Sequence, residues 1–207
     1  MMKFSTRQLV TLAVFGALWG AVEMSLGSVI KALNLPLSGA ILAGIGMLIV
    51  LIGRVFIPQR GSTLFIGVIA MVLKLFSIGS IIIGPMIGIL AEAILAEIVL
   101  SGFGKPSRLS FILTGEVAVT WTLVQPFFTG WLLFGRDMFI VWLDLLDQGA
   151  RLFGLNVEAA GLIVLVLLGV HLVIGAIAGW LAWNSAYRLQ ARLNRAPVTP
   201  TEESTQS

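Results

Sequence analysis

Residues 79–100 read GSIIIGPMIGILAEAILAEIVL, a segment apolar enough for lipid that nevertheless carries two carboxylates, Glu92 and Glu97. A charge at the centre of a bilayer costs about 2.5 to 3.5 kcal/mol, so each carboxylate needs a partner, a proton or a water-filled cavity. Five residues at about 100° each place the two side chains roughly 140° apart around a helix. We expect Glu92 to face an internal cavity and Glu97 to lie nearer an aqueous end. The alternative is that both form structural ion pairs.

The composition of the whole chain is that of an integral membrane protein. Of its 207 residues, 58% are hydrophobic and 11% are charged, and the mean hydropathy is +1.03. Soluble domains carry about 25% charged residues. The length fits a single membrane domain at residues 1–195. The sequence contains no cysteine, which excludes disulfides, thiolate metal sites and cysteine nucleophiles.

Apolar runs separated by polar links predict an all-α protein with six transmembrane helices, at residues 8–27, 39–57, 63–76, 81–100, 109–134 and 159–187. Within residues 136–158, apolar residues alternate with acidic ones. They predict an extra amphipathic helix between the last two spans, at the membrane interface or over a cavity mouth. Residues 196–207 lack apolar periodicity and are expected to form a disordered polar cytoplasmic tail.

The basic residues predict the orientation of these six spans. One side holds Lys3, Arg7, Arg54, Arg60, Lys105, Arg108, Arg188, Arg192 and Arg195, and the other holds Lys31, Lys74, Arg136 and Arg151. Cytoplasmic loops carry the excess of lysine and arginine, so both termini are expected in the cytoplasm. This topology explains the net charge of +3 without nucleic-acid binding.

The first predicted helix carries a stripe of small residues at four-residue spacing: Ala13, Ala17 and Ala21, with Gly16 and Gly20 on the adjacent stripe. Side chains four apart share a helix face, so this surface is smooth enough for another helix to approach closely.

Two further groups of residues are candidates for a binding site. At about 1.5 Å per residue, Glu92 and His171 lie roughly 16 and 18 Å below the outer edge, and Glu116 roughly 10 Å above the cytoplasmic edge. These three groups predict a polar cavity at mid depth. The alternatives are a simple interhelical hydrogen bond for His171, and a structural ion pair of Glu116 with Arg108 or Arg54.

The second group lies in the outer half of the predicted bundle. Glu23 and Lys74 end their helices on that side, where they either form an ion pair or help to close a ligand site. Trp121 and Gln125 lie on the outer part of the fifth helix. A few polar groups among aromatic rings are typical of a small-molecule site.

Motifs for catalysis are absent from the sequence. It has no Walker A loop, no H-E-x-x-H and no G-x-S-x-G. One histidine without cysteine makes a zinc site improbable. We therefore expect neither an enzyme nor a bound cofactor or metal.

Six spans with both ends inside, and the stretch Ala13-Val-Phe-Gly-Ala17, resemble the substrate-binding (S) components of energy-coupling factor transporters. The resemblance implies capture of a vitamin or related small molecule at a prokaryotic cell membrane. It also implies docking through an A-x-x-x-A stripe, here Ala13, Ala17 and Ala21, onto a transmembrane coupling subunit driven by ATPase subunits.

In that family the ligand lies in the outer half. The corresponding segments here are residues 28–36, which include Asn34, residues 81–92 and 121–129, and the outer half of the last helix. Members that take up nickel or cobalt begin with a Met-His stretch, whereas this chain begins Met1-Met2-Lys3, which argues against a metal substrate. A carboxylate such as Glu92 suits a cationic heterocycle, for example thiamine or its pyrimidine precursor.

Two other functions remain open from the sequence. The first is a small proton-coupled secondary transporter that uses Glu92, Glu116 and His171 as a relay. The second is a membrane scaffold without transport activity, in which the charges only fix helix packing.

Overall fold

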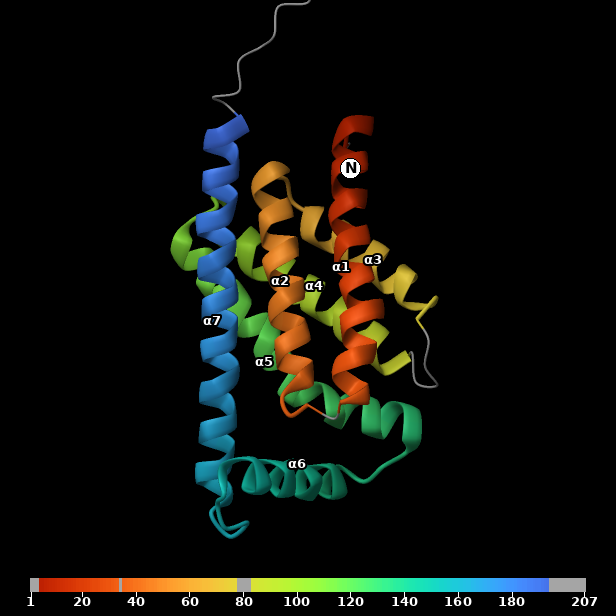
Figure 1. The fold of residues 1–207 in the computed structure, drawn as a ribbon, viewed down its shortest axis with the longest axis vertical. Helices are drawn as coiled ribbons and strands as arrows, with labels where there is room; N and C mark the ends of the chain where they lie inside the picture. The colour runs from red at the N-terminus through yellow and green to blue at the C-terminus, as the bar shows by residue number, and fades with distance from the viewer. Residues whose placement is uncertain (1–3, 34, 78–82, 194–207) are drawn as a thin grey trace, which may run out of the picture.

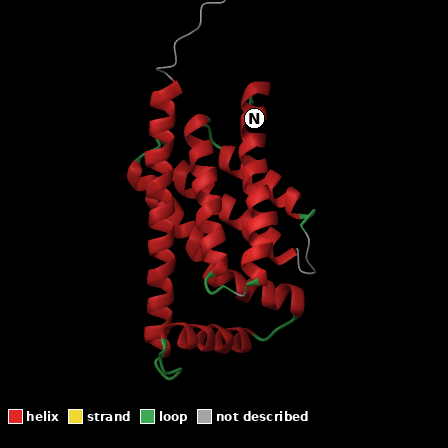
Figure 2. Cartoon of the chain, in the orientation of Figure 1, coloured by secondary structure: helices red, strands yellow, loops and turns green. Residues whose placement is uncertain are grey.

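The computed structural model describes residues 4–33, 35–77 and 83–193, and throughout these ranges the regular structure is helical (Figure 1, Figure 2). The helices are α1 (Thr6–Ala32), α2 (Ser38–Phe56), α3 (Ser62–Lys74), α4 (Ile83–Phe103), α5 (Arg108–Phe134), α6 (Met138–Phe153) and α7 (Ala160–Leu193). The predicted all-α fold class is confirmed for this part of the chain. Residues 196–207, for which the sequence predicted a disordered tail, lie outside it.

Five of the described helices, α1, α2, α4, α5 and α7, are long and apolar enough to cross a membrane, as expected of a multi-pass membrane-embedded protein. The sequence predicted six spans. The helix that differs is α3, which has 13 residues. At 1.5 Å per residue it is about 20 Å long, shorter than the hydrocarbon core of about 30 Å.

Helices α1, α2 and α7 run side by side, α4 and α5 pass obliquely behind them, and α6 lies across one end of the bundle (Figure 1). The first residues of α1 and the last residues of α7 lie together at the opposite end (Figure 1). Large side chains fill the centre, among them the fully buried Trp19, Met47, Leu51, Ile66 and Phe111. Burial of these side chains holds α1, α2, α3 and α5 around one core.

The boundaries of α6 follow from the residues at its two ends. The Asp137 carboxylate accepts a hydrogen bond from the amide of Phe139 at 2.7 Å, which caps the start of the helix. Gly154 has φ 66°, the left-handed conformation that commonly ends a helix. The helix is therefore shorter than the predicted amphipathic segment 136–158.

The first helix is longer than predicted, because it continues through Gly27 to Ala32. A Cβ atom at Gly27 would lie 3.4 Å from Nζ of Lys74 and 3.7 Å from Oε2 of Glu23. The glycine thus leaves room for a buried ion pair beside the helix, and it does not terminate the helix.

Candidate functional site

A cavity of about 840 Å³ lies at the end of the bundle that α6 covers. Its walls come from the last turn of α1, the start of α2, the middle of α5, and the facing parts of α6 and α7. The polar side chains among its lining residues are Ser38, Thr122, Gln125, Thr129, Gln148, Arg151 and His171. A cavity with mostly apolar walls and a few polar groups has the character of a small-molecule site.

The cavity begins where α5 and α7 separate. The two helices cross with their backbones in contact, because a Cβ atom at Gly175 would lie only 2.6 Å from Cα and from N of Glu116. Below that crossing, Thr122 of α5 and His171 of α7 line the cavity. Pro126 also lines it and has no N–H to donate to the Thr122 carbonyl, which leaves that backbone oxygen as an additional acceptor there.

Helix α6 covers the cavity with one face and exposes the other. Leu146 and Ala150 are buried in a small core with Ile163 and Leu167 of α7. Gly149 allows the two helices to approach, since a Cβ atom there would lie 3.1 Å from Cδ1 of Leu167. The lining residues contributed by α6 are Leu145, Gln148, Gly149, Arg151 and Leu152. The sequence predicted this helix at the membrane interface or over a cavity mouth, and its lining residues agree with the second of these positions.

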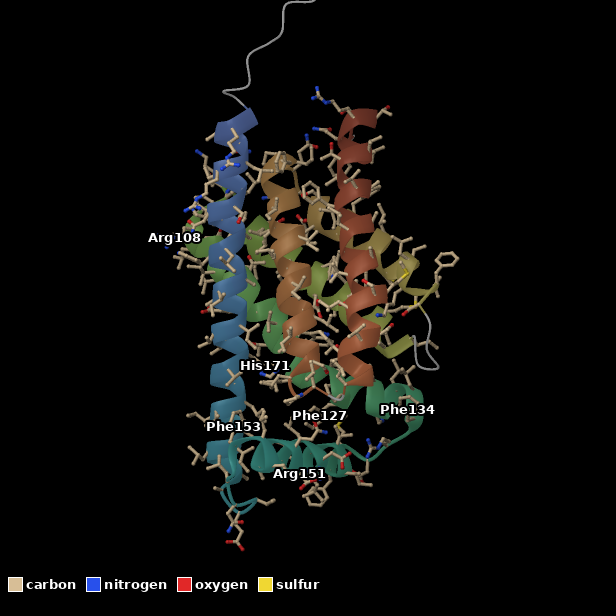
Figure 3. The ribbon with its side chains drawn as sticks, viewed as in Figure 1. Arg108, Phe127, Phe134, Arg151, Phe153 and His171 are labelled. Carbon is tan, nitrogen blue, oxygen red and sulfur yellow. The ribbon has the colours of Figure 1, made fainter. Side chains whose placement is uncertain are left out.

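His171 lines the cavity and is only 4% exposed (Figure 3). Its Nδ1 lies 2.7 Å from the carbonyl oxygen of Leu167, one turn earlier in the same helix. A carbonyl only accepts hydrogen bonds, so Nδ1 must carry the proton. In the neutral ring, Nε2 is then left as a hydrogen-bond acceptor. The hydrogen bond lies within α7 and is not the interhelical bond considered from the sequence.

Gln125 lines the same cavity and connects α5 to α4. Its Nε2 donates a hydrogen bond to the Gly84 carbonyl at 2.9 Å. A Cβ atom at Gly88 would lie 2.6 Å from its Oε1, so the glycine provides the space for the amide. Among the predicted site residues that the structure describes, Gln125 and His171 are the two that line this cavity.

Glu23 and Lys74 form a buried ion pair away from the cavity lining. Nζ of Lys74 lies 3.2 Å from Oε2 of Glu23 and 2.5 Å from the Glu23 carbonyl oxygen. The pair joins α1 to α3. Of the two interpretations of these residues, the ion pair is the one that the geometry supports.

Glu97 belongs to a second ion pair, with Arg54 of α2 at 3.3 Å. Its carboxylate also accepts hydrogen bonds from the Thr63 amide at 3.2 Å and the Ser101 hydroxyl at 2.7 Å. Arg54 therefore pairs with Glu97 and not with Glu116. Within the described ranges, Glu116 has no ion-pair partner, so the alternative considered for it, an ion pair with Arg108 or Arg54, is wrong.

Glu92 is 5% exposed, its Oε2 has no hydrogen-bond partner in the described structure, and it is not among the residues that line the cavity. Trp121 is not among them either. Its Nε1 is buried without a partner, and its ring packs 5.4 Å from that of Phe128, centroid to centroid. Asn34, also a predicted site residue, lies outside the described residues.

The two small-residue stripes of α1 have different surroundings. Gly16 and Gly20 pack against α3, where Cβ atoms would lie 2.7 Å from Cβ of Ile69 and 2.8 Å from Cβ of Leu73, respectively. Ala17 and Ala21 are exposed on the outside of the bundle, and Ala13 is intermediate. The exposed residues Val10, Val14 and Leu18 flank them. This outward apolar face is free for lipid or for another helix.

Several lining residues were not singled out from the sequence: Thr122, Gln148, Arg151 and the first turn of α2. The segments inferred from the family resemblance did contain part of the site, because residues 28–36, residues 121–129 and the last helix all contribute to the lining. The segment 81–92 does not contribute any of the lining residues that the structure describes.

The described residues contain no cluster of His, Cys, Asp and Glu suited to a metal ion. Comparisons of the chain with protein-family models, curated proteins and solved structures find no match.

Proposed function

We propose that the chain is the membrane-embedded substrate-binding subunit of an importer of the energy-coupling factor type. It captures a vitamin-like small molecule in the cavity under α6. The observation that carries this proposal is the cavity itself, whose 840 Å³ lies within the range of about 300 to 1,000 Å³ common for small-molecule sites.

The outward face of α1 supports the second half of the proposal, docking onto a transmembrane coupling subunit. Ala17 and Ala21 are exposed one turn apart, whereas the glycine stripe beside them is already used against α3. Small residues allow helix backbones in a membrane to approach closely. A partner helix would find a smooth strip on α1 with nothing from this chain covering it in the described structure.

The proposed topology has six passes, with α3 and its following turn making a short third pass, and with both termini in the cytoplasm of a prokaryotic cell. The charge bias of the loops supports this orientation. It places α6 and the cavity on the outer side, where a nutrient would arrive, and the start of α1 on the inner side, where ATPases act.

The test is purification of the full chain in mild detergent from its native host, followed by mass spectrometry of everything that accompanies it. We expect one small molecule together with a transmembrane partner and ATPase subunits. A preparation that contains neither, even after a vitamin panel is added, would contradict the proposal.

The docking face is tested by Ala17→Trp and Ala21→Trp. Both variants should lose uptake and partner co-purification while ligand affinity stays unchanged, because the indole prevents close helix approach but lies far from the cavity. The matched control is Ile177→Trp, on an exposed position of α7. Equal loss of uptake in all three variants would remove the special role of α1.

A second candidate function is favoured by one observation, the unpartnered Oε2 of the buried Glu92. A carboxylate of this kind inside a membrane is a candidate proton carrier. A proton-coupled carrier using Glu92, Glu116 and His171 would transport alone in liposomes and would respond to the proton gradient. The substrate-binding subunit would do neither without its ATPases.

A further inference from the structure

The charges around the cavity under α6 have one sign. Among the described side chains that line it, Arg151 alone carries a formal charge, and no aspartate or glutamate contributes. Arg151 pairs with Asp147, one turn earlier in α6, but Asp147 has 52% of its side chain exposed and does not line the cavity. An exposed pair of this kind is weak, so its guanidinium is available to a ligand.

The start of α2 adds positive potential to the same wall. The first N–H groups of a helix have no partner within the helix and carry about half a positive charge in total. Leu37 precedes α2 in the left-handed conformation at φ 58°, and no side chain caps the helix. Ser38 and Gly39, in the first turn, line the cavity.

His171, on the wall that α7 contributes, provides an independent indication of a ligand. Its side chain is buried and lines the cavity, its Nδ1 is bound to the Leu167 carbonyl, and its Nε2 has no partner in the described structure. This nitrogen is not among the buried side-chain atoms that lack a partner, so it is accessible from the cavity. A ligand N–H or O–H placed in the cavity would donate a hydrogen bond to it.

We infer that the ligand is a small organic anion, a carboxylate or a phosphate, whose acidic group lies between the start of α2 and Arg151. At its other end it donates a hydrogen bond to Nε2 of His171. This inference rests on the proposed function, because it requires that the cavity bind a small molecule. It also differs from the cationic heterocycle expected from Glu92, since a cation in this cavity would have no acidic partner among the described lining residues.

The first experiment measures binding of matched acid and neutral compounds to the purified full chain by calorimetry. The pairs are pantothenate with pantothenol, biotin with biotin amide, and pyridoxal phosphate with pyridoxal, and thiamine is the cationic probe. The small molecule that co-purifies with the chain is identified in parallel by mass spectrometry. We expect an acid, and we expect the acidic member of any pair that binds to bind at least about tenfold more tightly, as charged hydrogen bonds require.

The outcomes separate the two claims. Whether a carboxylate or the phosphate is preferred identifies which anion the site takes. A neutral or cationic co-purifying ligand, or tightest binding of thiamine, would overturn the anion inference and leave the proposed function standing. If no small molecule co-purifies with the chain and none of the added compounds binds, both the anion inference and the proposed function are overturned.

Variants then locate the anion. Arg151→Gln should weaken the acidic ligand about tenfold and leave its neutral analogue unchanged, while Arg151→Lys retains most of the affinity. The control is Arg108→Gln, the same substitution at an arginine near the opposite end of the bundle (Figure 3). Unchanged affinity in Arg151→Gln would contradict the placement of the anion.

A second pair of variants tests the acceptor. His171→Phe should weaken the ligand about tenfold through loss of Nε2, and His171→Gln should recover part of the affinity because its amide oxygen can accept. If both variants bind as the wild type does, His171 does not contact the ligand. Thermal unfolding of each variant without ligand shows whether the fold is retained.

Discussion

The polar side chains in two regions of this bundle differ in whether they have partners within the protein. Around α1 to α4, two acidic groups are paired with basic groups inside the protein, Glu23 with Lys74 and Glu97 with Arg54, whereas Glu92 of α4 keeps an unpartnered Oε2. Under α6, the polar side chains surround a cavity and keep unused hydrogen-bonding groups, as His171 does. The ion pairs of the first region are completed by the chain itself, whereas His171 in the second region keeps an acceptor that faces a cavity.

This difference shows why an ionisable residue in a membrane helix does not by itself identify a binding site. Lys74 and Arg54 are as buried as His171. What separates them is whether their hydrogen-bonding groups are satisfied by neighbours. Three predictions follow from this comparison of the two regions, and the outcome of each can contradict it.

The largest effect is expected for Lys74→Met, which leaves the Glu23 carboxylate buried without its partner. Breaking a buried ion pair on one side costs about 3 to 5 kcal/mol. Thermal unfolding in detergent should show a large loss of stability, and Glu23→Gln in the same chain should recover most of it. The control is Arg136→Met, which removes a cation from the exposed pair with Asp144 and should cost about 0 to 1 kcal/mol. Equal losses in both variants would show that the Glu23–Lys74 pair is not structural.

A smaller loss of stability is expected for Gly175→Ala at the crossing of α5 and α7. The added methyl group would meet the backbone of Glu116, and overpacking of this kind costs about 1 to 3 kcal/mol. Gly169→Ala in the same helix is the control, because no atom lies within 4 Å of its Cβ position. That control should be neutral or slightly stabilising. If Gly175→Ala were equally harmless, the close crossing that opens the cavity below it would be in doubt.

The smallest effect is expected for Glu92→Gln on ligand affinity. Glu92 does not line the cavity, and changes at independent sites couple by only about 0.3 to 0.5 kcal/mol, roughly a factor of two. Gln125→Ala, at the cavity wall, should weaken binding by a larger factor. A loss of binding or a changed proton dependence in Glu92→Gln would instead favour the proton-coupled carrier.

The sequence predicted most of the helices because apolar length and turn residues are local properties. The fifth predicted span, residues 109–134, ends where α5 ends, at Phe134, and Gly135 follows in the left-handed conformation that commonly ends a helix. The predicted end of the first helix at Gly27 is wrong for a reason that lies in the tertiary structure. This glycine accommodates the ion pair of Lys74 and Glu23, and the helix continues past it. The shortness of α3 was already visible in the sequence, which predicted residues 63–76 where the structure has Ser62–Lys74.

The candidate site was predicted only in part. Rise per residue gave an expected depth for Glu92 and His171, but depth does not specify the direction in which a side chain points. That direction depends on which helices pack together, and Glu92 lies outside the cavity lining although His171 lies within it. The contribution of Arg151 and of the α2 start required knowledge of where α6 folds back.

The central claim is that a small molecule occupies the space under α6. It is tested most directly by native mass spectrometry of the wild type and of Thr122→Trp, whose indole would fill that space, with Val117→Trp on the exposed face of α5 as control. The account predicts a bound small molecule in the wild type and in Val117→Trp, and an empty but stably folded Thr122→Trp. Retention of the same ligand by Thr122→Trp at the wild-type level would contradict it.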